Sequence, residues 1–427
     1  MNNNPAWLNE GLNHIWLPYT QMKTVASPIA VKSALGSRLT LEDGRELIDG
    51  ISSWWTTVHG YCHPHIEAAV KEQIEKLPHV MLGGLAHEQA YRLAQRLADI
   101  TPGDLSHVFY SESGSVSVEI AMKMAVQYWL NKGSRRTRFL SFTSGYHGDT
   151  FMTMSVCDPT KGMHSLFTGV VPDQLVVNLP EDEASIKAFE ETLERYGHEI
   201  AAVVMEPLVQ GAGGMVFHSL ETLARVRGAC DAHNILLILD EIFVGFGRLG
   251  SLFACQQANV VPDIMTVSKA LTGGTLPLSA TIARKHVFDA FYTDNESDVL
   301  MHGPTYMGNA LACAAANASL DLFENEPRMA QVEQIQRGLT QGLAPAREIA
   351  GVTDVRVRGA IGVIQVKEMR GLDDLKARFI EAGVWIRPFR DIIYTTPPYV
   401  ISADELAALT KAMVDVTHAW SKGQDFA

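Results

Sequence analysis

The chain has 427 residues, of which 47% are hydrophobic and 19% charged, and this is enough apolar material for a large core with a smaller satellite. Its formal net charge of −13 argues against a general binder of nucleic acids or anionic membranes, although local basic pockets could still hold anions. Five scattered cysteines without a CxxC pair indicate a reduced, cytoplasmic protein and neither a disulfide scaffold nor a zinc module.

The beginning of the chain and its apolar runs bear on targeting. The segment "MNNNPAWLNE" lacks a basic stretch followed by an apolar one, so we expect no secretory signal. No run reaches about 18 uninterrupted apolar residues, so we expect no membrane span.

The first two thirds of the chain alternate between helical periodicity and short apolar runs. The segment "SRLTLEDGRELIDG" predicts two strands joined by a turn at Asp43-Gly44. The pattern then predicts, in order, a helix over 63–77, a helix over 86–100, a strand at 107–110, a helix over 115–133 and a strand at 137–142.

Further along, the pattern predicts a strand at 201–205, a helix over about 219–233, and strands at 235–239 and 264–268. Apolar runs separated by helices indicate a mainly parallel sheet covered on both faces. We therefore predict one large α/β domain over residues 61–320.

The C-terminal part has a different pattern. A helix over about 327–345 precedes two short strands around Gly359, and a second helix, the short strands of "VWIRP" and "IIYTTPP" and a final helix follow. We predict a small α+β domain over 321–427, against which the N-terminal segment 1–60 packs.

Two charged residues come directly at the ends of buried strands. Asp240 ends the run "ILLIL", and Lys269 follows "IMTVS". Ligands of α/β proteins bind at the carboxyl ends of parallel strands. A structural ion pair is the alternative for each residue alone, but a buried pair is costly unless it is well satisfied. Together they fit pyridoxal phosphate, which needs a Schiff-base lysine and an acid beside its ring nitrogen.

Two segments could bind a phosphate. Ser113, Gly114 and Ser115 stand at the start of a long helix, where free N–H groups and the positive helix end suit an anion. An ordinary serine N-cap explains this short motif equally well on its own. The stretch "HGPTYMGN" also precedes a helix, and Thr305 in it could donate another hydrogen bond.

The loop "SGYHGDT" follows a predicted strand. Tyr146, between two glycines, has room to lie flat on a cofactor ring, with His147 and Asp149 behind it. A tight turn with a packed tyrosine is the alternative. The histidine spacings indicate no metal site.

The motifs "LILDEIFVGFGRLG", "SKALTGGT" and "GPTYMGN" resemble those of the class III, pyridoxal-phosphate-dependent aminotransferases of fold type I. The segments "WLPYTQM", "GISSWWTTVHGYCHP" and "GYHGDTFMTMSVCDP" are similar to one branch of that family. That branch aminates 8-amino-7-oxononanoate to 7,8-diaminononanoate in biotin biosynthesis, with S-adenosylmethionine as the usual amino donor. The resemblance runs from about residue 13 to the end of the chain. It implies a large cofactor-binding α/β domain with a smaller α+β domain.

The resemblance implies a role for each cofactor residue. Lys269 would form the Schiff base and then move the proton, and Asp240 would pair with the pyridine nitrogen. Tyr146 would stack on the cofactor and touch the substrate, while Gly114 and Ser115 would hold the phosphate.

It also implies a homodimer with shared active sites, in which Pro304 and Thr305 complete the phosphate site of the other subunit. Arg387 would bind the substrate carboxylate, since an arginine fork suits a carboxylate and an aromatic surface suits an apolar chain. Without this resemblance, an internal salt bridge explains Arg387, and core packing explains the two tryptophans. The substrate-binding residues implied are Tyr19, Trp54, Trp55, Tyr146, Lys269, Gly303, Arg387 and Tyr394.

The sequence departs from the family pattern at two places and leaves alternatives open. Glu112 stands where aspartate is expected, and Phe243-Val244 replaces a smaller pair. The nearest alternative is another class III ω-aminotransferase. The paired Trp54-Trp55 argues against this alternative. A decarboxylase, an aminomutase or a non-catalytic relative are further alternatives. Lysine as the amino donor is also open, because some members of the branch use it.

Overall fold

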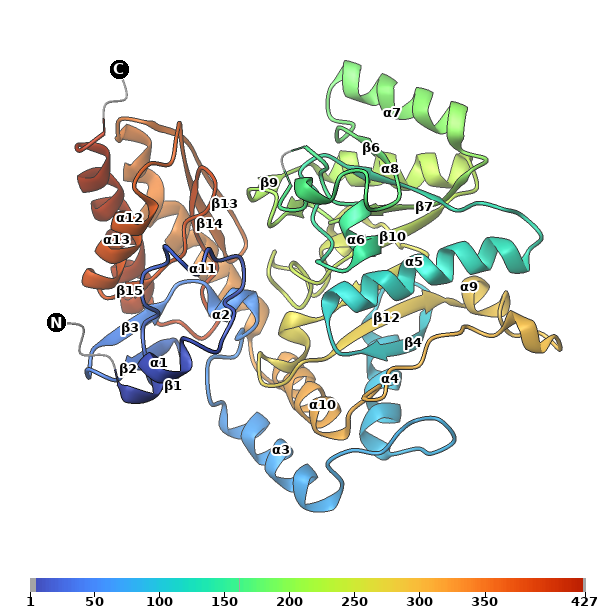
Figure 1. Ribbon diagram of the computed structural model, residues 1–427, viewed down its shortest axis with the longest axis horizontal. Coiled ribbons are helices and arrows are strands. Elements are labelled where there is room, and N and C mark those ends of the chain that lie inside the picture. Colours follow the sequence, from blue (N-terminus) through green and yellow to red (C-terminus); the bar gives the residue numbers. More distant parts are fainter. Residues whose placement is uncertain (1–4, 161, 425–427) are drawn as a thin grey trace. The chain divides into compact units, whose positions relative to one another are not determined.

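The computed structural model of the chain describes residues 5–160 and 162–424. Its contacts divide the chain into two compact units (Figure 1). Unit 1 is drawn from Met1–Trp54, His59–His63 and Gln334–Ala427, and unit 2 from Trp55–Val58 and Pro64–Glu333. Each unit has its own sheets and helices.

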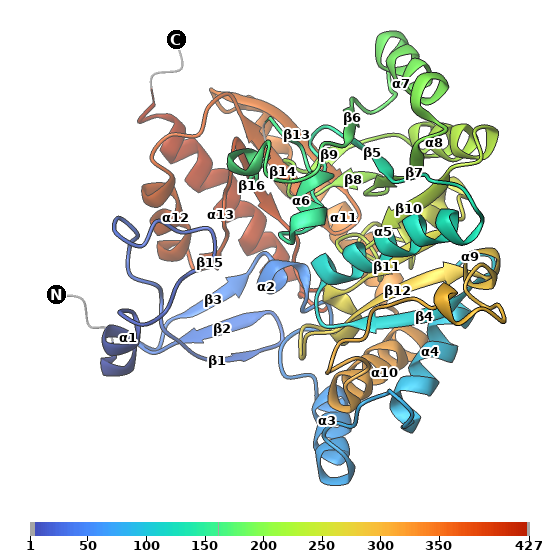
Figure 2. The ribbon, with the colours of Figure 1, turned by 45° about the vertical axis from the view of Figure 1, so that its right-hand side comes forward.

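A seven-stranded sheet forms the centre of unit 2 (Figure 2). Its strands are, in spatial order, β4 (Leu105–Ser111), β12 (Ser279–Arg284), β11 (Ile264–Val267), β10 (Leu236–Asp240), β7 (Ile200–Met205), β5 (Arg138–Phe142) and β6 (Leu175–Val177). The pairs from β11 to β6 are all parallel, whereas β12 is antiparallel to both β11 and β4. The predicted mainly parallel α/β sheet is therefore confirmed, with one antiparallel strand that the sequence pattern did not indicate.

Helices pack against this sheet. Helix α5 contacts five of its strands and buries an apolar surface that includes Val118, Ile120 and Trp129. Burying such surface is the main favourable term in folding a domain of this size. The helices of unit 2 are α3 (Pro64–Lys76), α4 (Glu88–Ile100), α5 (Gly114–Asn131), α6 (Phe151–Ser155), α7 (Glu183–Tyr196), α8 (Leu220–Ala232), α9 (Lys285–Asp289) and α10 (Ala310–Asn325). A short ribbon of β8 (Val209–Gln210) and β9 (Val216–Phe217) follows β7.

Unit 1 contains two small sheets. One has the order β1 (Val31–Leu35), β2 (Arg38–Leu41), β3 (Glu46–Asp49) and β15 (Val384–Trp385), and the other β13 (Val352–Arg358), β14 (Ile361–Val366) and β16 (Ile392–Thr395). Because β3 pairs with β15, the N-terminal strands and the C-terminal region share one sheet. The helices are α1 (Ala6–Gly11), α12 (Leu372–Glu381) and α13 (Ala403–Ser421), while α11 (Arg328–Leu343) lies at the division between the units.

A left-handed turn, labelled α2 (Ser52–Trp55), follows β3. The φ angles of its four residues run from 48° to 75°, although none of them is glycine. Left-handed backbone costs about 1–2 kcal/mol per residue that carries a Cβ atom. The buried carboxylate of Asp49 offsets this cost, because it accepts hydrogen bonds from the N–H groups of Ile51 (2.9 Å) and Ser53 (2.8 Å) and from the Tyr61 hydroxyl (2.6 Å).

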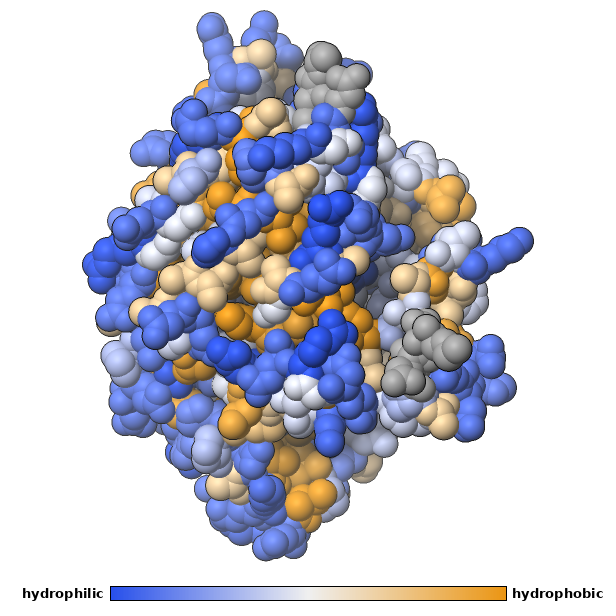
Figure 3. Space-filling model, turned by 90° about the vertical axis from the view of Figure 1, so that its left-hand side faces the viewer, coloured by the Kyte–Doolittle hydropathy of each residue, from blue (hydrophilic) through white to orange (hydrophobic). Residues whose placement is uncertain are grey.

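The surface carries hydrophobic side chains between hydrophilic ones, as Figure 3 shows for one face of the molecule. In unit 1 the exposed large apolar residues include Trp7, Ile15, Trp16 and Leu35. Across the two described ranges, no helix is both long enough and apolar enough to cross a membrane.

Candidate active site

A cavity of about 140 Å³ lies in unit 2, where the parallel strands end. Asp240 is the last residue of β10, Lys269 follows β11, and the loop of Tyr146 follows β5. Open α/β sheets bind their ligands at this edge. The lining brings together six of the residues predicted from the sequence, which are Trp55, Gly114, Ser115, Tyr146, Asp240 and Lys269.

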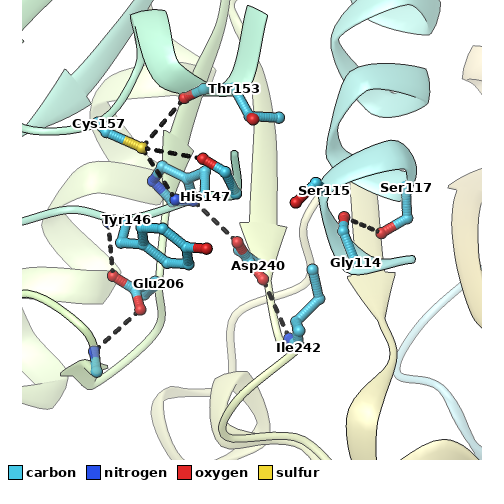
Figure 4. A network of polar contacts seen from close by, with 12 residues as sticks. Gly114, Ser115, Ser117, Tyr146, His147, Thr153, Cys157, Glu206, Asp240 and Ile242 are labelled. Carbon is cyan, nitrogen blue, oxygen red and sulfur yellow. Dashed lines mark hydrogen bonds and ion pairs between the residues drawn. The ribbon is translucent and has the colours of Figure 1, made fainter. Parts of the chain in front are cut away.

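Asp240 and His147 form a buried pair at the base of the cavity (Figure 4). His147 Nδ1 lies 2.9 Å from Asp240 Oδ2, and the Ile242 N–H donates to Asp240 Oδ1 at 3.1 Å. Burial alone would lower the pKa of His147. The hydrogen bond and the charge of Asp240, with the charge of Glu206, outweigh burial and raise this pKa. The contact with His147 and the Ile242 N–H therefore fix the position of the Asp240 side chain.

Glu206 is a cavity residue that the sequence reasoning missed. Its carboxylate accepts hydrogen bonds from the N–H groups of Tyr146 (3.3 Å) and Gly211 (3.0 Å). Burial raises the pKa of Glu206 to about 7 against the nearby charge of His147, which lowers it. Glu206 directly follows strand β7, as Asp240 ends β10, so the same strand-end rule would have found it.

Lys269 begins the short 3₁₀ turn after β11, with its backbone in a left-handed conformation at φ 43°. Strained backbone of this kind, at about 1–3 kcal/mol, concentrates at functional sites. Burial of the amine lowers the pKa of Lys269, although the charges of Asp240, Glu206 and Asp149 oppose this. Its Nζ lies 4.9 Å from the centre of the Trp55 ring, so the amine sits between an aromatic face and a cluster of acids.

The first turn of α5 forms another part of the cavity lining. Ser113 is the N-cap of the helix, and its hydroxyl accepts a hydrogen bond from the Val116 N–H at 3.3 Å. The alternative explanation of Ser113 as a helix cap is therefore confirmed. Gly114 and Ser115 open the helix, where N–H groups have no carbonyl partner within the helix. A Cβ atom on Gly114 would lie 3.0 Å from Ile242, so glycine allows the two elements to approach closely.

Tyr146 lies across this cavity from the first turn of α5, as Figure 4 shows. Its hydroxyl donates to Asp149 at 3.0 Å, and the Asp149 N–H donates to the Ser115 hydroxyl at 3.1 Å. His164 Nε2 also lies 3.1 Å from Asp149. These contacts hold the loop of Tyr146 against the start of the helix.

The cavity has the donors and acceptors that pyridoxal phosphate requires. Lys269 supplies an amine of lowered pKa, and Asp240 supplies a carboxyl group that is hydrogen-bonded to His147. The amide groups that open α5 suit a phosphate, and Ile242 and Tyr146 offer apolar and aromatic surface for a flat ring. The residues present therefore fit this cofactor.

A second cluster of predicted residues lies within unit 1. The guanidinium of Arg387 lies 4.4 Å from the ring centre of Trp54, and Tyr19 meets Trp54 edge-on at 6.2 Å. The pKa of Arg387 is lowered, because the effect of burial outweighs the opposing effects of Tyr394 and Tyr19. The cluster thus combines one partly buried cation with aromatic surface.

The remaining predicted residues do not line the Lys269 cavity. Gly303, Pro304 and Thr305 line another cavity of unit 2, of about 680 Å³. Met81, Tyr91 and Tyr110 also line it.

Comparison with known proteins gives a consistent result. A model of the aminotransferase class-III family matches residues 19–417. The chain is 47% identical, over 94% of both chains, to the adenosylmethionine-8-amino-7-oxononanoate aminotransferase of Mycobacterium leprae. The crystal structure of the enzyme of that name from Methanocaldococcus jannaschii superposes with a TM-score of 0.92 at 32% identity, covering 96% of this chain and 98% of that one. A pyridoxal-phosphate-bound amine transaminase from an uncultivated Pseudomonas species gives a TM-score of 0.89 at 30% identity, covering 96% of this chain and 99% of that one.

The match to the family model covers most of the chain, and the cavity holds the lysine, the acid and the helix start that its cofactor needs. The chain therefore belongs to the class III aminotransferases, which depend on pyridoxal phosphate.

Proposed function

We propose that this enzyme transfers an amino group from S-adenosylmethionine to 8-amino-7-oxononanoate and so forms 7,8-diaminononanoate for biotin biosynthesis. The 47% identity to the M. leprae relative over 94% of the chain carries the choice of substrates. The convergence of Lys269, Asp240 and the start of α5 on one cavity supports the reaction class.

Lys269 is the base and acid of the reaction. When bound, pyridoxal phosphate supplies a carbonyl that reacts with amines and a ring that draws electrons from the neighbouring carbon. A lysine of lowered pKa gives up its proton more readily than an exposed lysine does. Lys269 Nζ takes the proton from the amine-bearing carbon of the donor and returns a proton when the ketone of the acceptor is aminated.

Asp240 and the first turn of α5 orient the cofactor. The Asp240 carboxylate would hold the ring nitrogen in its protonated form, and the hydrogen bond to His147 fixes the position of that carboxylate. The N–H groups of Gly114 and Ser115 would bind the phosphate. Tyr146 would flank the ring, fixed by its contacts with Glu206 and Asp149.

Arg387 and its aromatic neighbours recognise the acid substrate. A guanidinium binds a carboxylate through two parallel hydrogen bonds. The exposed rings of Trp54 and Tyr19 offer apolar surface for a nine-carbon chain, whereas the predicted Tyr394 is buried. A pocket that pairs apolar surface with one charged group selects a long acid over a small one.

We also propose that two copies of the chain form a homodimer with shared active sites. Pro304 and Thr305 lie in a cavity other than that of Lys269, so they are available to the site of a second copy. Large exposed apolar residues, Met81, Tyr91 and Met301, occur in the same unit and suit burial in such an interface.

The cysteines support a cytoplasmic location. Cys157, Cys230, Cys255 and Cys313 are buried and form no disulfide. Free thiols of this kind persist in a reducing compartment. Fractionation of cells that produce the enzyme, with antibody detection, tests this location.

Absorbance spectroscopy of the holoenzyme tests the reaction. We expect a visible cofactor band that fades when S-adenosylmethionine is added and returns with 8-amino-7-oxononanoate. The Lys269→Ala variant should lack this band. A band that fades with lysine or 4-aminobutyrate, but not with S-adenosylmethionine, would replace the proposed donor.

A further inference from the structure

Phe243 is part of the lining of the Lys269 cavity. It follows Asp240 by three residues in the turn after β10. The ring is 5% exposed. None of the roles assigned above to the cavity residues uses it.

The ring of Phe243 is fixed from two sides. Its centre lies 4.2 Å from the centre of the Trp55 ring, at an interplanar angle of 47°. It also packs against Gly211, where a Cβ atom would lie 2.6 Å from Phe243 Cδ1. The Gly211 N–H donates to Glu206, which fixes this glycine in turn. Phe243 therefore fills the space between the 211 turn and Trp55.

This packing determines how close Trp55 comes to the reacting amine. Lys269 Nζ lies 4.9 Å from the centre of the Trp55 ring. The Trp55 ring also packs against the Phe243 ring. A substrate carbon that exchanges a proton with Lys269 must come close to Nζ. Any side group on that carbon then competes for space with the two aromatic rings.

We propose that Phe243 determines substrate specificity by limiting the width of the side group on the carbon that carries the transferred amine. The proposal rests on the proposed function in one respect, namely that Lys269 Nζ is where the proton is exchanged. It adds that Phe243, through Trp55, keeps the reacting end of the cavity narrow.

The test measures the donor half-reaction with two amines that differ in the size of one substituent on the carbon that carries the amine. Holoenzyme is mixed with propan-2-amine or with 1-phenylethylamine, and the fading of the visible cofactor band gives a rate constant for each. Phe243→Ala should raise the ratio of the rate constant for 1-phenylethylamine to that for propan-2-amine at least tenfold. The reason is that small differences in fit within an apolar pocket change rates by about 10–200-fold. Phe243→Leu should give a ratio between that of Phe243→Ala and that of the wild type.

Phe253→Leu is the matched control, because Phe253 is a buried phenylalanine of the same segment that does not line the cavity. It should leave the ratio unchanged. A variant that retains the cofactor through gel filtration is folded. If Phe243→Ala loses the cofactor, Phe243→Leu is used to measure the ratio. An unchanged ratio, within about twofold, in a variant at Phe243 that retains cofactor overturns the proposal.

The experiment separates this proposal from the choice of substrates. Wild-type enzyme that fails to aminate 8-amino-7-oxononanoate contradicts the proposed substrate. The ratio for the two simple amines still decides the role of Phe243, because it needs neither biotin precursor nor S-adenosylmethionine.

Discussion

His147 Nδ1 lies 2.9 Å from the carboxylate of Asp240, and both side chains are buried. A charge-assisted hydrogen bond of this kind contributes about 1.5–3 kcal/mol. Because Asp240 is the residue proposed to hold the ring nitrogen, the histidine acts on the cofactor through the aspartate.

Replacing His147 should therefore weaken cofactor binding. His147→Gln is expected to raise the cofactor dissociation constant roughly 10- to 100-fold, which is the loss of one charge-assisted hydrogen bond expressed as affinity. Titration of apoprotein with pyridoxal phosphate, followed by absorbance, measures this. His286→Gln is the control, because His286 faces Asp263 outside the cavity. Equal affinity in the two variants would contradict the role of His147.

Glu206 should make the apoprotein less stable as pH rises. Its pKa is raised from 4.5 to about 7, so the folded state binds more protons than the unfolded chain between these values. The contribution of Glu206 to the free energy of unfolding is complete below about pH 4.5 and is lost as the pH rises through about 7. The amount lost is on the order of 3 kcal/mol. The raised pKa of His147 acts with the same sign.

Comparing wild type with Glu206→Gln isolates this effect. The amide stays neutral at every pH, so the variant should gain stability relative to the wild type between pH 5 and pH 8. Denaturant unfolding of both apoproteins at several pH values gives the difference. A difference that does not change with pH would show that Glu206 titrates normally.

Asp49 should be a main support of the left-handed turn α2. Asp49→Ala removes the acceptor for Ile51, Ser53 and Tyr61 and should cost about 2–3 kcal/mol of unfolding free energy. Ser53→Gly should instead stabilise by about 1 kcal/mol, because glycine adopts the φ of 48° without strain. Asp43→Ala, at an exposed turn, should change stability by less than about 0.5 kcal/mol. Denaturant unfolding of the three variants tests this order.

Much of unit 2 could be predicted because its strands are short, apolar and separated by periodic helices. The strand predicted at 235–239 is β10 (Leu236–Asp240), and the helix predicted over 115–133 is α5 (Gly114–Asn131). Strand β12 (Ser279–Arg284) was not predicted, since serine, threonine and arginine interrupt its apolar pattern. The strand expected in "VWIRP" is only two residues long, and the proline in it has no N–H to donate to a sheet.

The site residues at strand ends could also be predicted, because one rule covers Asp240 and Lys269. The conformation of Ser52–Trp55 could not, since it depends on Asp49 and on the Ser52 hydroxyl bonding to Thr396, 344 residues away in sequence. The same holds for the contact of Phe243 with Gly211, which no local pattern indicates.

Arg387 should recognise the carboxylate of the substrate. Arg387→Lys keeps the charge but loses the planar fork and its stacking on Trp54. The variant should lose about 100-fold in kcat/KM for 8-amino-7-oxononanoate, mainly through KM, because the lost contact binds the ground state and the transition state alike. Steady-state kinetics with the methyl ester of the same substrate is the control, and the ester should react equally with both proteins. Equal losses for the acid and the ester would contradict the assignment.

Thr305 should act in the active site of the second subunit, because it lines a cavity other than that of Lys269. Thr305→Ala homodimers should bind pyridoxal phosphate roughly tenfold more weakly, through the loss of a hydrogen bond to a charged group. A heterodimer of one Lys269→Ala subunit and one Thr305→Ala subunit should regain one site of wild-type affinity, since the intact Lys269 then meets an intact Thr305. A heterodimer that carries both changes in the same subunit should have its one Lys269 site at the weaker affinity. Differently tagged subunits, purified as heterodimers and titrated with cofactor, distinguish the two arrangements. The opposite order of affinities in the two heterodimers would mean that each subunit completes its own site, and identical affinities would mean that Thr305 does not contribute to cofactor binding.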